Sequence, residues 1–184
     1  MTPLAIKADD PSYPAFLREL MCEESPPELT ALGNLDLLAL PTTAVFCSNR
    51  CHGNVILPPY DQAARWREAG RCVIGGFHSP VEKECLRILL RGAAPVILCP
   101  ARGMLERLPA QWAIAVAGGW MLLLSCFPMA ANRVTAELAT RRNEFIAALA
   151  DEVFVAHATP GGRLESLLHK INLWHLNPPR GNSS

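Results

Sequence analysis

The polar segment Ser48-Asn49-Arg50 contains the residue types that hold a phosphate group. It directly follows the apolar run 43–47 and combines backbone N–H groups, two small polar side chains and a guanidinium. Backbone N–H groups of this kind bind anions, and a guanidinium can bind two phosphate oxygens at once. A polar loop with a solvated arginine is the alternative interpretation of this segment.

Gly75 and Gly76 stand between a second apolar run and a helix-start pattern at Ser79. Glycine lets the backbone approach a ligand closely, and a helix N-terminus carries free N–H groups and a positive potential. His78 could contact a ligand held there or pack over the loop. The pattern favours anion binding, and the alternative is a tight turn closed by a capping box between Ser79 and Glu82.

A third loop and one helix supply the remaining candidates. Gly161 and Gly162 precede Arg163 at another strand-to-helix turn, which indicates a second phosphate cradle or plain turn chemistry. Arg142 and Asn143 project at neighbouring angles from one predicted helix, where they could contact phosphate or base edges. A solvated charged surface is an equally good interpretation of that pair.

Other chemistry has weaker support in the sequence. Cys47, Cys51 and His52 are spaced almost like metal or haem ligands. However, the second ligand pair of a structural zinc site is missing, and the haem spacing is off by one residue. The glycine-rich fingerprints of dinucleotide and nucleoside-triphosphate loops are absent as well. We therefore predict no cofactor and no metal ion.

The elements that position these residues belong to one globular domain. The chain has 184 residues, of which 50% are hydrophobic and 18% charged, enough for one sizeable core. A formal net charge of +0 excludes a strongly basic polymer binder but leaves room for a local basic site. Fourteen of the 17 basic residues are arginine, which favours a phosphate-bearing ligand.

The cysteines and the apolar segments indicate a cytoplasmic protein. Seven scattered cysteines and the lack of a signal-peptide pattern favour free thiols in a reducing compartment. The stretch 108–132 carries no charge and is long enough to span a bilayer. Because Gly118 and Gly119 divide it and Pro128 ends it, we predict a buried helix, a turn and a strand instead of a membrane helix.

Apolar runs of strand length alternate with helical segments along the chain. This alternation predicts the α/β class, with a mostly parallel sheet covered by helices on both faces. Ligands bind such sheets outside the carboxyl ends of the strands, where the candidate loops lie. The predicted strands are 28–32, 43–47, 72–75, 95–99, 121–127, 153–156 and 171–176, and the predicted helices are 14–21, 60–69, 80–91, 108–117, 133–150 and 163–170.

These loops, in this order, resemble the DNA-processing protein A (DprA/Smf) family. The resemblance implies a single Rossmann-like domain over 41–176, with an N-terminal extension, 1–40, packed on it as a short helix and turn, and a loose tail, 177–184. The family's Arg-Asn-Arg helix is similar to Arg142-Asn143-Glu144, where a glutamate replaces the second arginine and weakens polyanion binding. The other similar segments are Tyr13-Pro14, Pro26-Pro27, Gly33-Asn34, 45–50, 75–82 and 153–163.

The resemblance implies a non-catalytic protein that binds single-stranded DNA or a nucleotide-derived ligand through these loops. It also implies a homodimer. The wider superfamily holds the LOG proteins, whose Pro-Gly-Gly motif is partly similar to 160–165. This second resemblance offers a nucleoside monophosphate phosphoribohydrolase as an alternative, with Glu165 as the carboxylate and Arg142 as the clamp. A regulatory protein with a decayed pocket is the third possibility.

Overall fold

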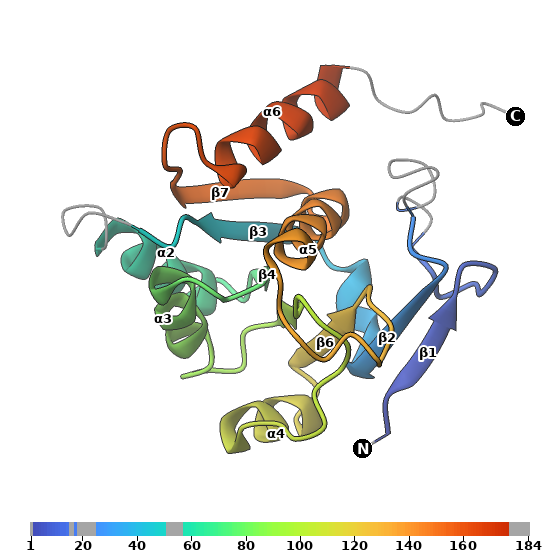
Figure 1. Ribbon diagram of the computed structural model, residues 1–184. Coiled ribbons are helices and arrows are strands. Elements are labelled where there is room, and N and C mark those ends of the chain that lie inside the picture. The colour runs from blue at the N-terminus through green and yellow to red at the C-terminus, as the bar shows by residue number, and fades with distance from the viewer. Residues whose placement is uncertain (1, 15–16, 18–24, 51–56, 177–184) are drawn as a thin grey trace, which may run out of the picture.

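The computed structural model describes residues 2–14, 17, 25–50 and 57–176. In this part of the chain, seven strands form one sheet in the order β1-β2-β6-β5-β4-β3-β7 (Figure 1). The strands from β6 to β7 in this order are parallel, whereas β2 is antiparallel to both β1 and β6. The α/β class and the mostly parallel sheet are thus confirmed.

The central strands match the apolar runs of the sequence because both of their faces are covered. Every residue of β3 and of β6 is buried, so neither strand alternates between polar and apolar residues. The strands are β1 (Leu4–Lys7), β2 (Glu28–Gly33), β3 (Thr42–Cys47), β4 (Cys72–Gly75), β5 (Val96–Leu98), β6 (Met121–Ser125) and β7 (Glu152–His157).

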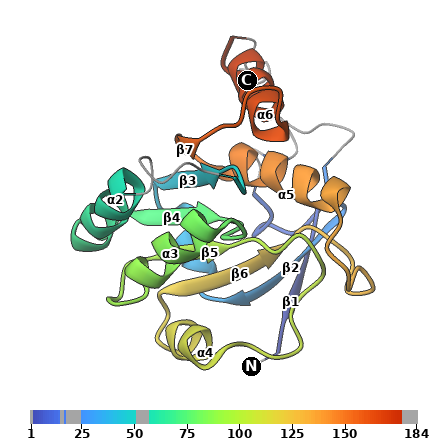
Figure 2. The same ribbon diagram turned by 60° about the vertical axis from the view of Figure 1, so that its left-hand side comes forward.

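Helices cover both faces of the sheet (Figure 2). The right-handed crossovers from β3 to β6 put α2, α3 and α4 on one face, and the return from β6 to β7 puts α5 on the other, beside α6. Two apolar cores result, one on each face. The helices are α2 (Leu57–Glu68), α3 (Pro80–Leu89), α4 (Ala110–Ala117), α5 (Ala136–Leu149) and α6 (Arg163–Leu176), with a 3-10 helix, η2, at Leu35–Ala39.

The starts of the helices that border the site follow from capping residues. The Ser79 hydroxyl accepts a hydrogen bond from the N–H of Glu82, and Pro80 occupies the first turn of α3, so the predicted capping box is confirmed. Thr135 caps α5 by accepting from the N–H of Leu138, 3.1 Å away. The helix predicted from residue 133 therefore begins three residues later.

The predicted strand at 171–176 is wrong, because this segment forms the second half of α6. Leu164, Leu167 and Ile171 are all buried and are spaced by three and four residues, which places them on one helical stripe against α5. The stretch 108–132 contains α4, a turn and β6, as predicted. Within the described residues, no helix combines the length and apolar character needed to cross a bilayer.

The N-terminal segment contributes two strands to the sheet. β1 pairs with β2, and β2 pairs with β6, so these two strands share the core of the later strands. The buried Tyr13 donates its hydroxyl to the carbonyl of Pro26 at 2.7 Å. Most of the helix predicted at 14–21 and the whole tail lie outside the described residues, and the boundary at residue 40 stays a prediction.

Candidate nucleic-acid interface

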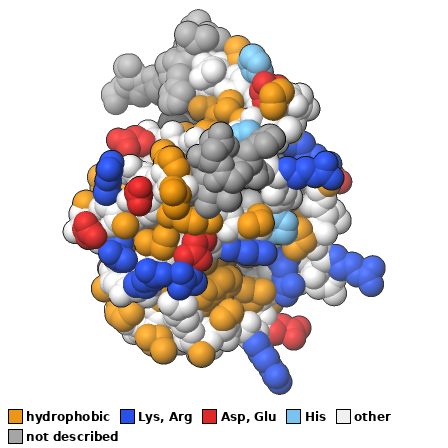
Figure 3. Space-filling view, turned by 90° about the vertical axis from the view of Figure 1, so that its left-hand side faces the viewer, with side chains coloured by type: hydrophobic (Ala, Val, Ile, Leu, Met, Phe, Trp, Pro, Cys, Tyr) orange, Lys and Arg blue, Asp and Glu red, His pale blue; other side chains and the backbone are white. Residues whose placement is uncertain are grey.

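The candidate site lies where the order of the strands reverses. From β3 the chain proceeds to β4, β5 and β6 on one side, and then adds β7 on the other side of β3. Crevices at such a switch point, beyond the carboxyl ends of the strands, are the usual ligand sites of open parallel sheets. A cleft of about 340 Å³ is located there. Figure 3 faces this edge and shows Lys and Arg side chains spread across it.

Among the described residues, the cleft is lined by the end of β3, the loops that follow β3, β4 and β7, the first turns of α3 and α6, and one turn of α5. They bring together eight of the residues predicted from the sequence, namely Ser48, Asn49, Arg50, His78, Arg142, Asn143, Gly162 and Arg163. Gly75, Gly76 and Gly161 do not line it. The other lining residues are Phe46, Cys47, Ser79, Glu82, Ala139, Thr140, Thr159, Leu164 and Leu167.

An irregularity in the pairing of β3 and β7 shapes one wall of the cleft. The register shifts between Phe46 and Cys47, at the carboxyl end of β3. Ser48 then donates its N–H to the carbonyl of His157 at 2.9 Å, and its hydroxyl accepts the N–H of Thr159 at 3.0 Å. Ser48 therefore ties the two loops together, and Arg50 follows it at the exposed rim.

Arg142 lies in the cleft as a buried cation, with only 5% of its surface exposed. Its Nε donates to Oδ1 of Asn143 at 2.8 Å, and its Nη1 donates to the carbonyl of Cys99 at 3.3 Å. Within the described residues Nη2 has no hydrogen-bond partner. Burial lowers the pKa of this guanidinium, and the nearby Glu82 carboxylate opposes that shift. The solvated alternative for Arg142 is wrong, and the two N–H groups of Nη2 remain for a ligand.

Gly76 makes room for this guanidinium although it does not line the cleft. A Cβ atom at Gly76 would overlap Nη1 and Cζ of Arg142, so no larger residue fits while the arginine keeps its place. The glycine predicted to admit a ligand to the backbone admits a side chain of the protein instead.

Glu82 is a second buried charge in the cleft, with 6% of its surface exposed. Its Oε1 accepts the N–H of Cys47 at 2.8 Å, and its Oε2 accepts the N–H groups of His78 at 2.8 Å and Ser79 at 3.1 Å. The capping box made Glu82 visible in the sequence. No local signal reveals the bond to Cys47, which is 35 residues away in the chain.

The second glycine loop is also occupied by a carboxylate of the protein. Gly161, with a φ of 70°, donates its N–H to Oε2 of Glu165 at 2.8 Å. Glu165 is exposed and does not line the cleft, in contrast to its neighbours Gly162 and Arg163. Because its carboxylate caps the turn away from the cleft, no observation favours the hydrolase alternative.

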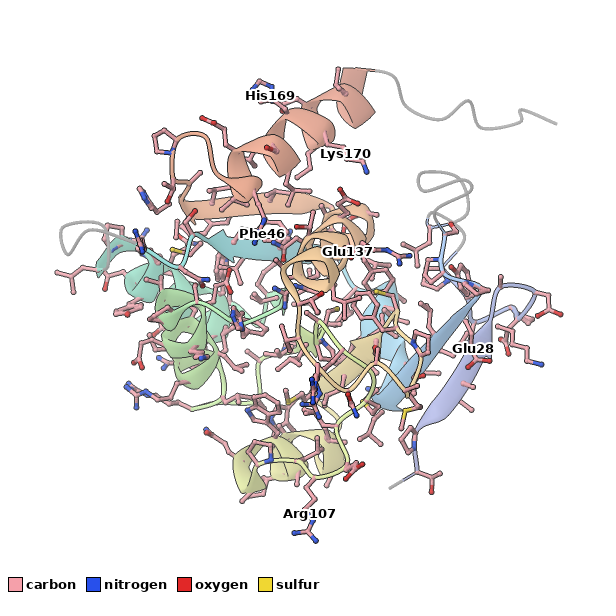
Figure 4. All side chains as sticks on the ribbon, viewed as in Figure 1. Glu28, Phe46, Arg107, Glu137, His169 and Lys170 are labelled. Atoms are coloured by element: carbon pink, nitrogen blue, oxygen red, sulfur yellow. The ribbon has the colours of Figure 1, made fainter. Side chains whose placement is uncertain are left out.

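Glu144 does not carry its negative charge into the cleft. It forms an ion pair with Lys170 at 3.2 Å, which joins α5 to α6. Figure 4 shows Lys170 on the side of α6 that faces α5, whereas His169 points away from it. Among the described residues, three arginines and one glutamate line the cleft, which gives it a surplus of positive charge.

A comparison with protein families agrees with this architecture. The family model for DNA recombination-mediator protein A matches residues 5–167. The chain belongs to that family. The family assignment confirms the resemblance found in the sequence. No curated protein matches the chain.

Two solved structures have the same fold. DNA processing protein A from Streptococcus pneumoniae superposes with a TM-score of 0.71 at 22% identity, over 91% of this chain and 60% of that protein. The protein from Helicobacter pylori superposes with a TM-score of 0.76 at 17% identity, over 100% of this chain and 84% of that one. This chain thus spans about three-fifths of the length of the pneumococcal relative.

Proposed function

We propose that this chain binds single-stranded DNA through the cleft at the end of β3 and β7, without catalysis. Arg50 and Arg163 hold phosphates at the rim, and Arg142 holds one at the floor. One observation carries the proposal: arginines from three separate segments converge on the switch-point cleft of a DNA recombination-mediator protein A chain. The structure of the H. pylori relative is described as having a unique single-stranded DNA binding mode, which supports this choice of ligand.

The arrangement of charges supports a nucleic-acid strand that lies across the cleft as the ligand. Arg50 and Arg163 are exposed, so a strand lying across the cleft reaches them without entering it. Arg142 is buried in the cleft and offers Nη2, which has no hydrogen-bond partner among the described residues. Guanidinium groups bind phosphate oxygens well and release counterions when they do so. His78 and Asn143 also line the cleft and supply polar contacts to bases or sugars.

Fluorescence anisotropy with a labelled oligothymidylate at low salt tests this function. The variant Arg50→Ala/Arg163→Ala removes two exposed side chains and should lower affinity about tenfold or more. The matched control is Arg65→Ala/Arg91→Ala, which removes two exposed arginines that do not line the cleft. Equal losses in both variants would show that net charge, and not the cleft, determines binding.

We further propose a homodimer in the cytoplasm. The cysteines at 47, 72, 85, 99 and 126 are free thiols, which is typical of a reducing compartment. Leu173 on α6 is 59% exposed, so its apolar side chain is available for contact with a second copy of the chain. Light scattering coupled to size exclusion tests the dimer: a single mass at twice 20.1 kDa is expected, and a monomer mass at all concentrations would disprove it.

A further inference from the structure

The Glu82 carboxylate is held as an anion by backbone N–H groups. The donors are Cys47 at the carboxyl end of β3, and His78 and Ser79 just before α3, all within 3.1 Å. We call these three N–H groups the amide nest. Converging N–H groups at a helix start are the arrangement with which proteins bind phosphate. In this cleft a side chain of the protein fills that arrangement.

We propose that Glu82 is the specificity-determining residue of the cleft: by filling the amide nest it excludes terminal phosphate groups and leaves the internal phosphodiesters of a strand as the ligand. This inference rests on the proposed function, because it states which phosphates of nucleic acid the cleft accepts. Glu82 contacts the backbone at the end of β3 and in the loop before α3, and it acts by occupying the place that a phosphate monoester would need.

The balance of charge in the cleft supports this selection. A phosphate monoester carries about 1.5 to 2 negative charges at neutral pH, whereas a diester carries one. At the floor, the positive charge of Arg142 already interacts with the Glu82 carboxylate, and both groups are almost fully buried. A second, doubly charged group there would be repelled by Glu82, and water screens that repulsion poorly.

The hydrogen-bond donors left in the cleft also favour internal phosphodiesters over terminal phosphates. With the amide nest occupied, the positively charged donors that remain among the described lining residues are guanidinium groups: Nη2 of Arg142, and the exposed ends of Arg50 and Arg163. These donors lie on separate segments, so they suit the two free oxygens of successive diesters better than the three oxygens of one terminal phosphate. The cleft can therefore bind a nucleic-acid strand at any position along its length.

Competition on the wild-type protein gives the first test. Labelled oligothymidylate is displaced with unlabelled oligothymidylate that has or lacks a 5′-phosphate, and with thymidine 5′-monophosphate. We expect the two oligonucleotides to differ by less than about twofold in affinity. The mononucleotide in large excess should not displace the probe. Displacement by the mononucleotide, or clearly tighter binding of the phosphorylated end, would overturn the inference.

The variant Glu82→Ala gives the second test, because it empties the amide nest. Millimolar inorganic phosphate should raise its melting temperature by about 4 °C, with potassium chloride of equal ionic strength as the reference. Wild type should not respond. Glu84→Ala is the matched control, since it removes a carboxylate from the same helix that pairs with Arg87 outside the nest. Absence of a phosphate response in Glu82→Ala, or the same response in the control, counts against the inference.

The two tests separate this inference from the proposed function. If wild type binds oligothymidylate through Arg50 and Arg163 but also binds the mononucleotide, only the role of Glu82 is disproved. If wild type binds no oligonucleotide and Glu82→Ala still responds to phosphate, the proposed function fails, and of the inference only the exclusion of phosphate from the amide nest by Glu82 stands. If Glu82→Ala does not fold, the competition on wild type decides the question.

Discussion

The guanidinium of Arg142 lies against the backbone of Gly76, in the space that a side chain at residue 76 would occupy. One residue is in the middle of α5 and the other follows β4, so the contact joins the helix on one face to the carboxyl end of the sheet. Arg142 is thereby held at the floor of the cleft, with Nε and Nη1 bonded and Nη2 free within the described residues.

Gly76→Ala should therefore lower the affinity for DNA, because it displaces Arg142. The added methyl group displaces the guanidinium, and overpacking of this kind costs about 1–3 kcal/mol of unfolding free energy. We expect anisotropy titrations to show a loss of affinity close to that of Arg142→Ala. Gly92→Ala is the control, because its new Cβ would meet only the flexible stem of Arg67, at 3.2 Å. Wild-type affinity in Gly76→Ala would show that the position of Arg142 is irrelevant to binding.

The salt dependence of DNA binding counts the phosphates that the cleft neutralises. Three arginines on three phosphates predict a slope of log affinity against log salt near −2, since single strands contribute about −0.7 per phosphate. Removal of Arg50 and Arg163 should reduce the slope to about −0.7. The measurement is a series of titrations at rising salt, with Arg65→Ala/Arg91→Ala retaining the wild-type slope. An unchanged slope in the cleft variant would place the contacts elsewhere.

The Glu144–Lys170 ion pair should stabilise the packing of α5 against α6 without affecting the affinity for DNA. The sequence predicted that Glu144 weakens polyanion binding, but Lys170 lies 3.2 Å from its carboxylate, and Glu144 does not line the cleft. Glu144→Gln should therefore change DNA affinity less than about twofold. A double-mutant cycle with Lys170→Met, read by denaturant unfolding, should give a coupling of about 0.5 kcal/mol.

Glu137→Gln is the control for that experiment, because it removes another acidic side chain from α5, at its exposed start (Figure 4). If Glu144→Gln tightens DNA binding strongly while Glu137→Gln does not, the charge of Glu144 acts on the ligand as the sequence suggested.

The sequence predicts the central strands well because burial on both faces leaves continuous apolar runs. It fails where an apolar segment fits two structures: at 171–176, burial of Ile171 on the stripe of α6 outweighs the strand-like composition. It also misses β1, a short edge strand in which only Ile6 is buried. With four residues, such an edge strand is too short to show a repeating pattern that distinguishes it from a loop.

The sequence predicts which loops form the site but does not predict the side-chain contacts within it. The rule for parallel sheets indicates the carboxyl ends of β3, β4 and β7, and these ends line the cleft. The burial of Arg142 depends on Gly76 and Cys99, which lie far away in the chain. The occupation of the amide nest depends on the reach of Glu82 across to β3. Both are tertiary contacts without a local signature.

The buried thiols predict a loss of stability at alkaline pH. Burial raises the pKa of Cys72, Cys85 and Cys126 from 9.0 to about 12, and raises that of Cys99 further. Above pH 9 the unfolded chain therefore releases thiol protons that the folded chain retains. Folding stability then falls as pH rises, over the window from about 9 to 12. We expect a loss of about 1 kcal/mol per thiol by pH 10.

Denaturant unfolding at pH 8 and pH 10 measures this effect. Because lysines and tyrosines also titrate in this range, the comparison is with Cys72→Ala/Cys85→Ala. Both of these cysteines are buried, and neither lines the cleft. The variant should be less stable than wild type at pH 8 and should lose about 2–3 kcal/mol less between the two pH values. Since a cavity costs the same free energy at either pH, only the difference between the two losses reports on the thiols. Equal losses would mean that these thiols ionise in the folded protein as readily as in water.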